Sequence, residues 1–101
     1  MAGKAENRQA IEKVGAYHEA CLAQLIDSVG EALDRYRAGE IDAFAMDEVI
    51  HQYHNAARKL WSFCWAGSSS RHRVAALAID DMAVRGEPVD WWAEGASRTR
   101  E

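Results

Sequence analysis

Three polar residues in the middle of the chain have the types and spacing of metal ligands. Glu48 and His51 stand three positions apart, and His54 follows three positions later. Because positions i and i+3 of a helix project together, Glu-x-x-His pairs are used by carboxylate-bridged metal centres in helical bundles. A helical wheel centred on the apolar Met46, however, puts Glu48 about 200° and His51 about 140° away. We therefore interpret the three as a solvent-exposed helix face, with a metal-binding bundle as the alternative.

A fourth histidine, His18, differs because it lies on the apolar side of the predicted first helix. We expect it to be buried, neutral and held by an aromatic neighbour. Counting outward from a turn at Gly39 makes that neighbour Trp61 and puts Trp65 beside Gly15, which we interpret as space for the indole. A buried neutral histidine predicts a fold that loses stability near pH 6.

The remaining nucleophiles and motifs do not indicate catalysis. The count from the turn separates Cys21 from Cys64 by some turns, so we interpret both as packing residues rather than as a disulfide. The sequence contains no glycine-rich phosphate loop, Cys-x-x-Cys pair or nucleophile elbow. We therefore predict no catalytic residue and no cofactor, and favour a protein that is not an enzyme.

A run of basic residues suggests a further alternative. Four cations occur without an intervening acid, namely Arg58, Lys59, Arg71 and Arg73. Two helices joined here by a short turn could imitate a DNA-binding helix-turn-helix. The whole chain is nevertheless acidic, with 12 Lys and Arg against 16 Asp and Glu, whereas nucleic-acid-binding modules are normally basic. Nucleic-acid binding is the less favoured interpretation.

Four tryptophans are the candidate interaction residues. Trp61 and Trp65 belong to the end of the second helix, and Trp91 and Trp92 lie close to the end of the chain. We expect the C-terminal turn to fold back and close the open end of the core with its indoles. The alternative is an exposed patch for a partner, because tryptophan is favoured at interaction hot spots.

Helices must position all these side chains, because apolar residues recur at three- and four-residue spacing and Pro88 is the only proline. The pattern predicts helices over about 6–37, 42–66 and 71–85, a short turn over about 90–94, and frayed ends. Asp42, Asp90 and one of the serines at 68–70 are the predicted N-caps, and Gly39 and Gly86 the predicted exits. The predicted inward residues of the third helix are Val74, Leu77, Ala78 and Met82.

The fold class that follows is all-α, in a single domain of 101 residues. It consists of a long antiparallel helical hairpin, a shorter third helix and a C-terminal aromatic turn. The third helix is too short to cover such a hairpin, so an apolar stripe remains. We expect this stripe to contact a second copy, which gives a homodimer with a four-helix core. The predicted function is that of an interaction or regulatory protein acting through this apolar surface.

Composition limits the possible classes further. Hydrophobic residues make up 49% and charged residues 28% of the chain, which is typical of a globular protein. No apolar run approaches the roughly 18 residues of a membrane span, and the first residues carry no apolar signal segment. With only two cysteines, a reducing cytoplasm is the simplest expectation.

Several short stretches resemble a group of small all-helical proteins from high-GC bacteria. The stretches are Arg37–Asp42, Tyr53–His54, Leu60–Cys64 and Asp90–Gly95, the last with an Asp-Trp-Trp motif. The resemblance covers most of the chain from about Tyr36 onward. It implies a bacterial, cytoplasmic, all-helical protein and transfers no activity or site residue.

Overall fold

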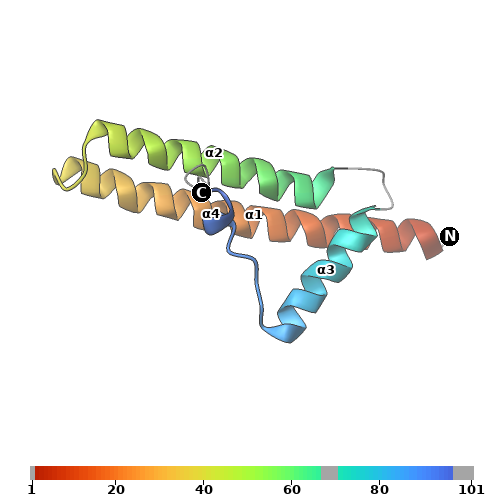
Figure 1. The fold of residues 1–101 in the computed structure, drawn as a ribbon. Coiled ribbons are helices and arrows are strands. Elements are labelled where there is room, and N and C mark those ends of the chain that lie inside the picture. The colour runs from red at the N-terminus through yellow and green to blue at the C-terminus, as the bar shows by residue number, and fades with distance from the viewer. Residues whose placement is uncertain (1, 67–70, 97–101) are drawn as a thin grey trace.

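The computed structural model describes residues 2–66 and 71–96, which form four helices (Figure 1). Helices α1 (Ala2–Arg37) and α2 (Ala43–Trp65) run antiparallel, followed by α3 (Arg71–Arg85) and the short α4 (Trp91–Glu94). The predicted all-α fold, with its long hairpin, third helix and C-terminal turn, is confirmed. The first helix begins four residues earlier than predicted. None of the described helices is both long and apolar enough to cross a membrane.

Two aspartates begin helices as predicted. The Asp42 side chain accepts a hydrogen bond from the Ala45 N–H at 2.9 Å, and that of Asp90 accepts one from the Ala93 N–H at 3.2 Å. Each bond satisfies a backbone donor that has no partner inside its helix. The predicted cap at 68–70 lies outside the described residues.

Two glycines end helices, also as predicted. Gly39 and Gly86 have φ angles of +82° and +67°, a left-handed conformation that costs glycine little. After Gly86, the Glu87 N–H donates to the Met82 carbonyl at 3.0 Å, which turns the chain out of α3. The hairpin turn and the exit from α3 are therefore both encoded locally.

The core lies along the seam between α1 and α2. Val14 and Leu25 from α1 and Leu60 and Cys64 from α2 are almost completely buried. The larger aromatic side chains lie around this seam and are only partly buried. The core cluster continues from the hairpin into α3 through Ala75 and Ala76.

The predicted inward face of α3 is wrong for Val74 and Leu77, whereas Ala78 and Met82 are half-buried. Val74 and Leu77 are 59% and 68% exposed, whereas Ala75 and Ala76 are buried and Ile79 packs against the core. Small side chains permit a close approach of α3 to α1. This close approach, together with the ion pairs beside it, determines which face of α3 packs against α1. The sizes of the apolar side chains alone do not determine it.

Candidate interaction surface

The aromatic contact between the two long helices fixes their register. Trp65 Nε1–H donates to His18 Nδ1 at 2.8 Å, with the ring centroids 6.2 Å apart. The predicted pairing of His18 with Trp61 is therefore wrong by one helical turn. Side chains lean toward the N-terminus of their own helix. His18 therefore leans toward the open end of the hairpin and Trp65 leans toward the turn, so the two side chains approach each other. Burial lowers the pKa of His18 below its ordinary value of 6.5.

The interpretation of Gly15 as space for an indole is also wrong. A Cβ atom added at Gly15 would meet nothing within 4 Å. The close approach occurs instead at Gly95, where an added Cβ would lie 2.5 Å from the Gln52 carbonyl oxygen and 2.7 Å from the Ala56 backbone nitrogen. Gly95 therefore lets the end of α4 lie directly on the backbone of α2.

Helix α4 is held on the middle of the hairpin. Trp91 Nε1–H donates to the Tyr17 hydroxyl at 2.8 Å, and its ring lies 5.5 Å from that of Phe63. Gln52 and Lys59 donate to the backbone carbonyls of Trp92 and Glu94, at 2.8 and 2.7 Å. The predicted return of the C-terminal turn is confirmed, but α4 packs beside the central turns of α2 rather than at the open end (Figure 1). These bonds satisfy carbonyls that a short helix leaves without partners.

The other face of the hairpin is apolar and uncovered within the described chain. At 100° per residue, Ile50 and Trp61 lie about 160° and 180° around α2 from Gln52, which holds α4. Ile26, Ile50 and Trp61 are 57%, 50% and 52% exposed. A groove of about 150 Å³ runs between α1 and α2 on this side and is lined by Ile26, Val29, Ile50 and Tyr53. We name these four residues and Trp61 the hairpin face.

The four predicted interaction tryptophans thus have different surroundings. Trp65 contacts His18 and, edge to face, His72 with a centroid distance of 5.4 Å. Trp91 and Trp92 pack against the core from α4. Trp61 alone among the four is more than half exposed, and it belongs to the hairpin face.

The candidate metal ligands lie on the exposed side of α2. Glu48, His51 and His54 are all exposed, and His51 Nε2 lies 3.2 Å from the Asp47 carboxylate. Within the described residues, no group of three or more histidine, cysteine or acidic side chains is arranged to hold a metal ion.

The basic residues do not form one surface. Lys59 is bonded to the end of α4, and Arg73 lies 3.9 Å from Glu6 of α1. Arg58 is exposed on α2, while the side chain of Arg71 lies outside the described set. Two of the four cations are therefore held by partners within the chain.

The two thiols belong to one packed region of the core. Cys21 and Cys64 are both free, and the partly buried Cys21 packs against the core cluster that contains the buried Cys64. Burial raises the pKa of Cys21, and it raises that of Cys64 to about 11, with the Cys21 thiol adding to this effect. Burial likewise raises the pKa of Tyr17 to about 12. All three groups are therefore protonated, and weak as nucleophiles, at neutral pH.

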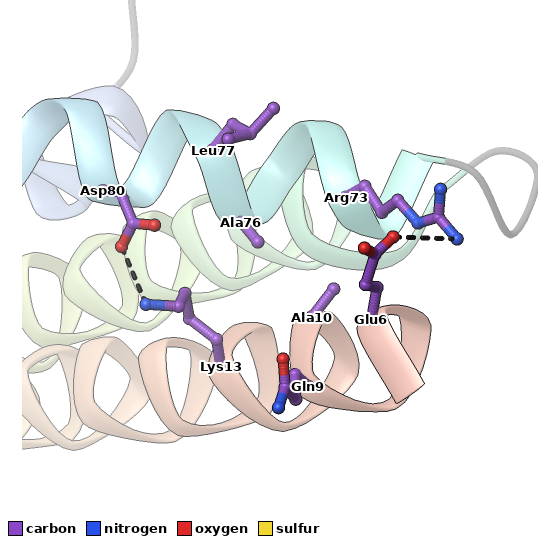
Figure 2. A pocket seen from close by; sticks show the side chains of 8 residues that line it. All are labelled: Glu6, Gln9, Ala10, Lys13, Arg73, Ala76, Leu77 and Asp80. Atoms are coloured by element: carbon purple, nitrogen blue, oxygen red, sulfur yellow. Dashed lines mark hydrogen bonds and ion pairs between the residues drawn. The ribbon is translucent and has the colours of Figure 1, made fainter. Parts of the chain in front are cut away.

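A second hollow of about 310 Å³ lies between α1 and α3 (Figure 2). Its floor is formed by Ala10 and Ala76. At one end Lys13 Nζ lies 2.8 Å from Asp80, and at the other Arg73 is paired with Glu6. The charged side chains in this cleft form ion pairs between α1 and α3, so we interpret them as the contacts that hold α3 against α1.

Comparison of the chain with known protein families, with curated proteins and with solved structures finds no match.

Proposed function

We propose that the protein is a non-enzymatic interaction or regulatory protein that works as a homodimer, with the hairpin face as its interface. The observation that carries the proposal is the apolar groove lined by half-exposed Ile26 and Ile50, with half-exposed Trp61 further along the same side of α2. Exposed apolar patches mark interaction sites, and tryptophan is enriched among the residues that dominate binding energy. The protonated thiols and phenol support the non-enzymatic part of the proposal.

The surface area of the chain favours a second copy as the occupant. One chain exposes 7170 Å², whereas a compact monomer of 11.3 kDa exposes about 5,700 Å². The excess is roughly 1,500 Å², and a standard interface takes only about 800 Å² from each partner. A twofold dimer would cover the same face on both copies and complete a four-helix core.

The test is the molar mass in solution, measured by light scattering after gel filtration at micromolar concentration. The wild type is expected at twice the 11.3 kDa of one chain, and Ile26→Glu at the mass of one chain. Val84→Glu is the matched control, because Val84 is 86% exposed on α3, outside the hairpin face. A wild type with the mass of a single chain would overturn the proposal.

We also propose a bacterial, cytoplasmic setting. The two free thiols and the short stretches ending in Asp90–Gly95 support it. Fractionation of the native host, with the protein detected by antibody, is expected to recover it in the cytoplasmic fraction.

A further inference from the structure

A cavity of about 150 Å³ lies between α1 and the segment that enters α4. One wall is formed by residues between 21 and 28 of α1 and the other by residues 89–92. Gln24 in the first wall lies about 160° around α1 from Ile26, so the cavity is on the opposite side of the hairpin from the hairpin face. Gln24 and Asp90 are exposed, whereas Leu25 is only 2% exposed. The cavity therefore extends from the solvent to the core.

The electrostatic character of this cavity is negative. Among the described residues that line it, only Asp90 carries a charge. Its Oδ1 accepts a hydrogen bond from the Ala93 N–H at 3.2 Å, and no ion pair among the described residues includes it. Burial raises the pKa of Cys21 in the opposite wall, so this thiol is uncharged at neutral pH. A carboxylate without a cationic partner attracts a cation and repels an anion.

Two indoles form part of the same wall. Trp91 and Trp92 both line the cavity and are both half-buried. The Trp91 ring is fixed by its bond to Tyr17 at 2.8 Å, and the Trp92 backbone by the bond from Gln52 at 2.8 Å. Indole attracts cations through its π system more strongly than the other aromatic side chains do. Because the α4 segment is already held in place, a ligand would lose little affinity to ordering it.

The size and lining of the cavity restrict the class of cation. A cavity of about 150 Å³ has room for a molecule about the size of benzene. In the part of the chain that the structure describes, no three histidine, cysteine or acidic side chains are arranged for a metal ion. A primary ammonium group is strongly hydrated and has three N–H donors that need acceptors. A quaternary ammonium ion has no N–H donors, and its methyl groups suit a lining of indole and aliphatic side chains.

We propose that this cavity binds a small quaternary ammonium ion, with the Asp90 carboxylate balancing its charge and the indoles of Trp91 and Trp92 contacting its methyl groups. The site is formed within one chain, so it does not depend on the proposed dimer. It gives the protein a small-molecule ligand in addition to a protein partner, and the ligand would contact the segment that closes the side of the hairpin.

The probe for this site is tetramethylammonium chloride, titrated into the full chain at constant ionic strength. The backbone amide and indole N–H signals of residues 89–92 are followed by NMR. We expect saturable shifts of these signals, with a dissociation constant in the millimolar range. tert-Butyl alcohol has a similar size but no charge, and it should bind at least about tenfold more weakly.

Two substitutions test the role of the carboxylate. Asp90→Asn removes the charge but keeps the helix cap, because asparagine caps as well as aspartate does, and we expect it to weaken cation binding by about tenfold. Asp42→Asn, the same change at the cap of α2, is the matched control and should leave the affinity unchanged. Gln24→Glu adds a second carboxylate at the exposed edge of the cavity and should strengthen binding by about threefold.

The outcomes distinguish this site from the proposed dimer interface. Ile26→Glu alters the hairpin face on the opposite side of the hairpin and is expected to bind the cation as the wild type does. Absence of a saturable shift, or equal affinity for tert-butyl alcohol, would overturn the inference. So would equal affinities of Asp90→Asn and Asp42→Asn. Circular dichroism of each variant shows whether its helices are intact, so that lost binding is not mistaken for a lost fold.

Discussion

At the scale of single residues, the bond from Trp65 to His18 makes the fold sensitive to acid. Nδ1 of His18 accepts the indole proton at 2.8 Å, so it must be unprotonated in the folded state. Burial lowers the pKa of this histidine below 6.5, and as the pH falls the unfolded chain therefore takes up the proton first. The stability that the neutral ring contributes is complete above about pH 6.5 and is lost as the pH falls through that value toward the lower folded pKa.

The measurement is thermal unfolding of the wild type and of His18→Gln at pH 7.5 and 5.5. We expect the melting temperature of the wild type to fall further between pH 7.5 and pH 5.5 than that of the variant. The same loss in both proteins would show that His18 is not the group responsible.

Two glycines offer a matched pair of substitutions. Gly95→Ala forces a Cβ against the backbone of α2 at 2.5 Å, and we expect a loss of about 1–3 kcal/mol, as for other overpacked sites. Gly15→Ala adds a methyl group in open space within a helix, and should stabilise by about 0.5–1 kcal/mol. Urea unfolding monitored by circular dichroism gives both values. Equal effects of the two substitutions would contradict the close approach at Gly95.

At the scale of elements, α4 closes the side of the hairpin, and its removal should therefore destabilise the whole chain. A protein ending at Val89 loses the contacts of Trp91 with Tyr17 and Phe63 and those of Gly95. Trp91 and Trp92 are partly buried and packed against the core, and removing a core tryptophan costs about 3–5 kcal/mol, so losing the two together with Gly95 should lower the melting temperature by more than about 10 °C.

The control for this truncation is a chain that ends at Ala96, which keeps every described contact of α4. It should melt close to the full-length protein. If the chain ending at Val89 also melts there, α4 contributes to neither the core nor the stability of the hairpin.

Local signals in the sequence were sufficient to predict the elements. The caps at Asp42 and Asp90 and the exits at Gly39 and Gly86 act on neighbouring residues, so the ends of the helices follow from the chain around them. The inward face of α3 is a tertiary property. Ala76 faces α1 because a small side chain and the flanking ion pairs permit close contact, and a rule that buries the largest apolar residues selects the opposite face.

The candidate surface could be predicted only in part. The lengths of the helices predict an uncovered apolar stripe. The predicted pairing of Trp61 with His18, however, hides the fact that Trp61 belongs to the exposed hairpin face. The sequence does not indicate the roles of Tyr17 and Gly95, because their partners are distant in the chain. Tyr17 bonds to Trp91, which is 74 residues away, and Gly95 lies against the backbone of α2. The position of Gly95 just after the capped turn at Asp90–Glu94 is a sequence signal for a close backbone contact. It does not indicate that the contact is made with α2.

At the scale of the whole molecule, the protein is a rod with extents of 58 × 28 × 24 Å. Its radius of gyration is 16.4 Å, against about 12.7 Å for a compact domain of this length. Because α3 and α4 both pack on one face of the long hairpin, the opposite face is left uncovered by the described chain. The low compactness and the exposed apolar groove are therefore two consequences of the same geometry, and a second copy on that face would remove both.

This geometry predicts that stability depends on protein concentration. If folding is coupled to pairing through the hairpin face, mass action stabilises the folded dimer as concentration rises. For two chains of this length, each tenfold increase should raise the melting temperature by about 3 °C. The wild type should therefore melt about 6 °C higher at 100 μM than at 1 μM, whereas Ile26→Glu should melt at one temperature throughout. Differential scanning fluorimetry over this range makes the comparison, and a wild-type melting temperature that stays constant would mean that the hairpin is stable without a partner.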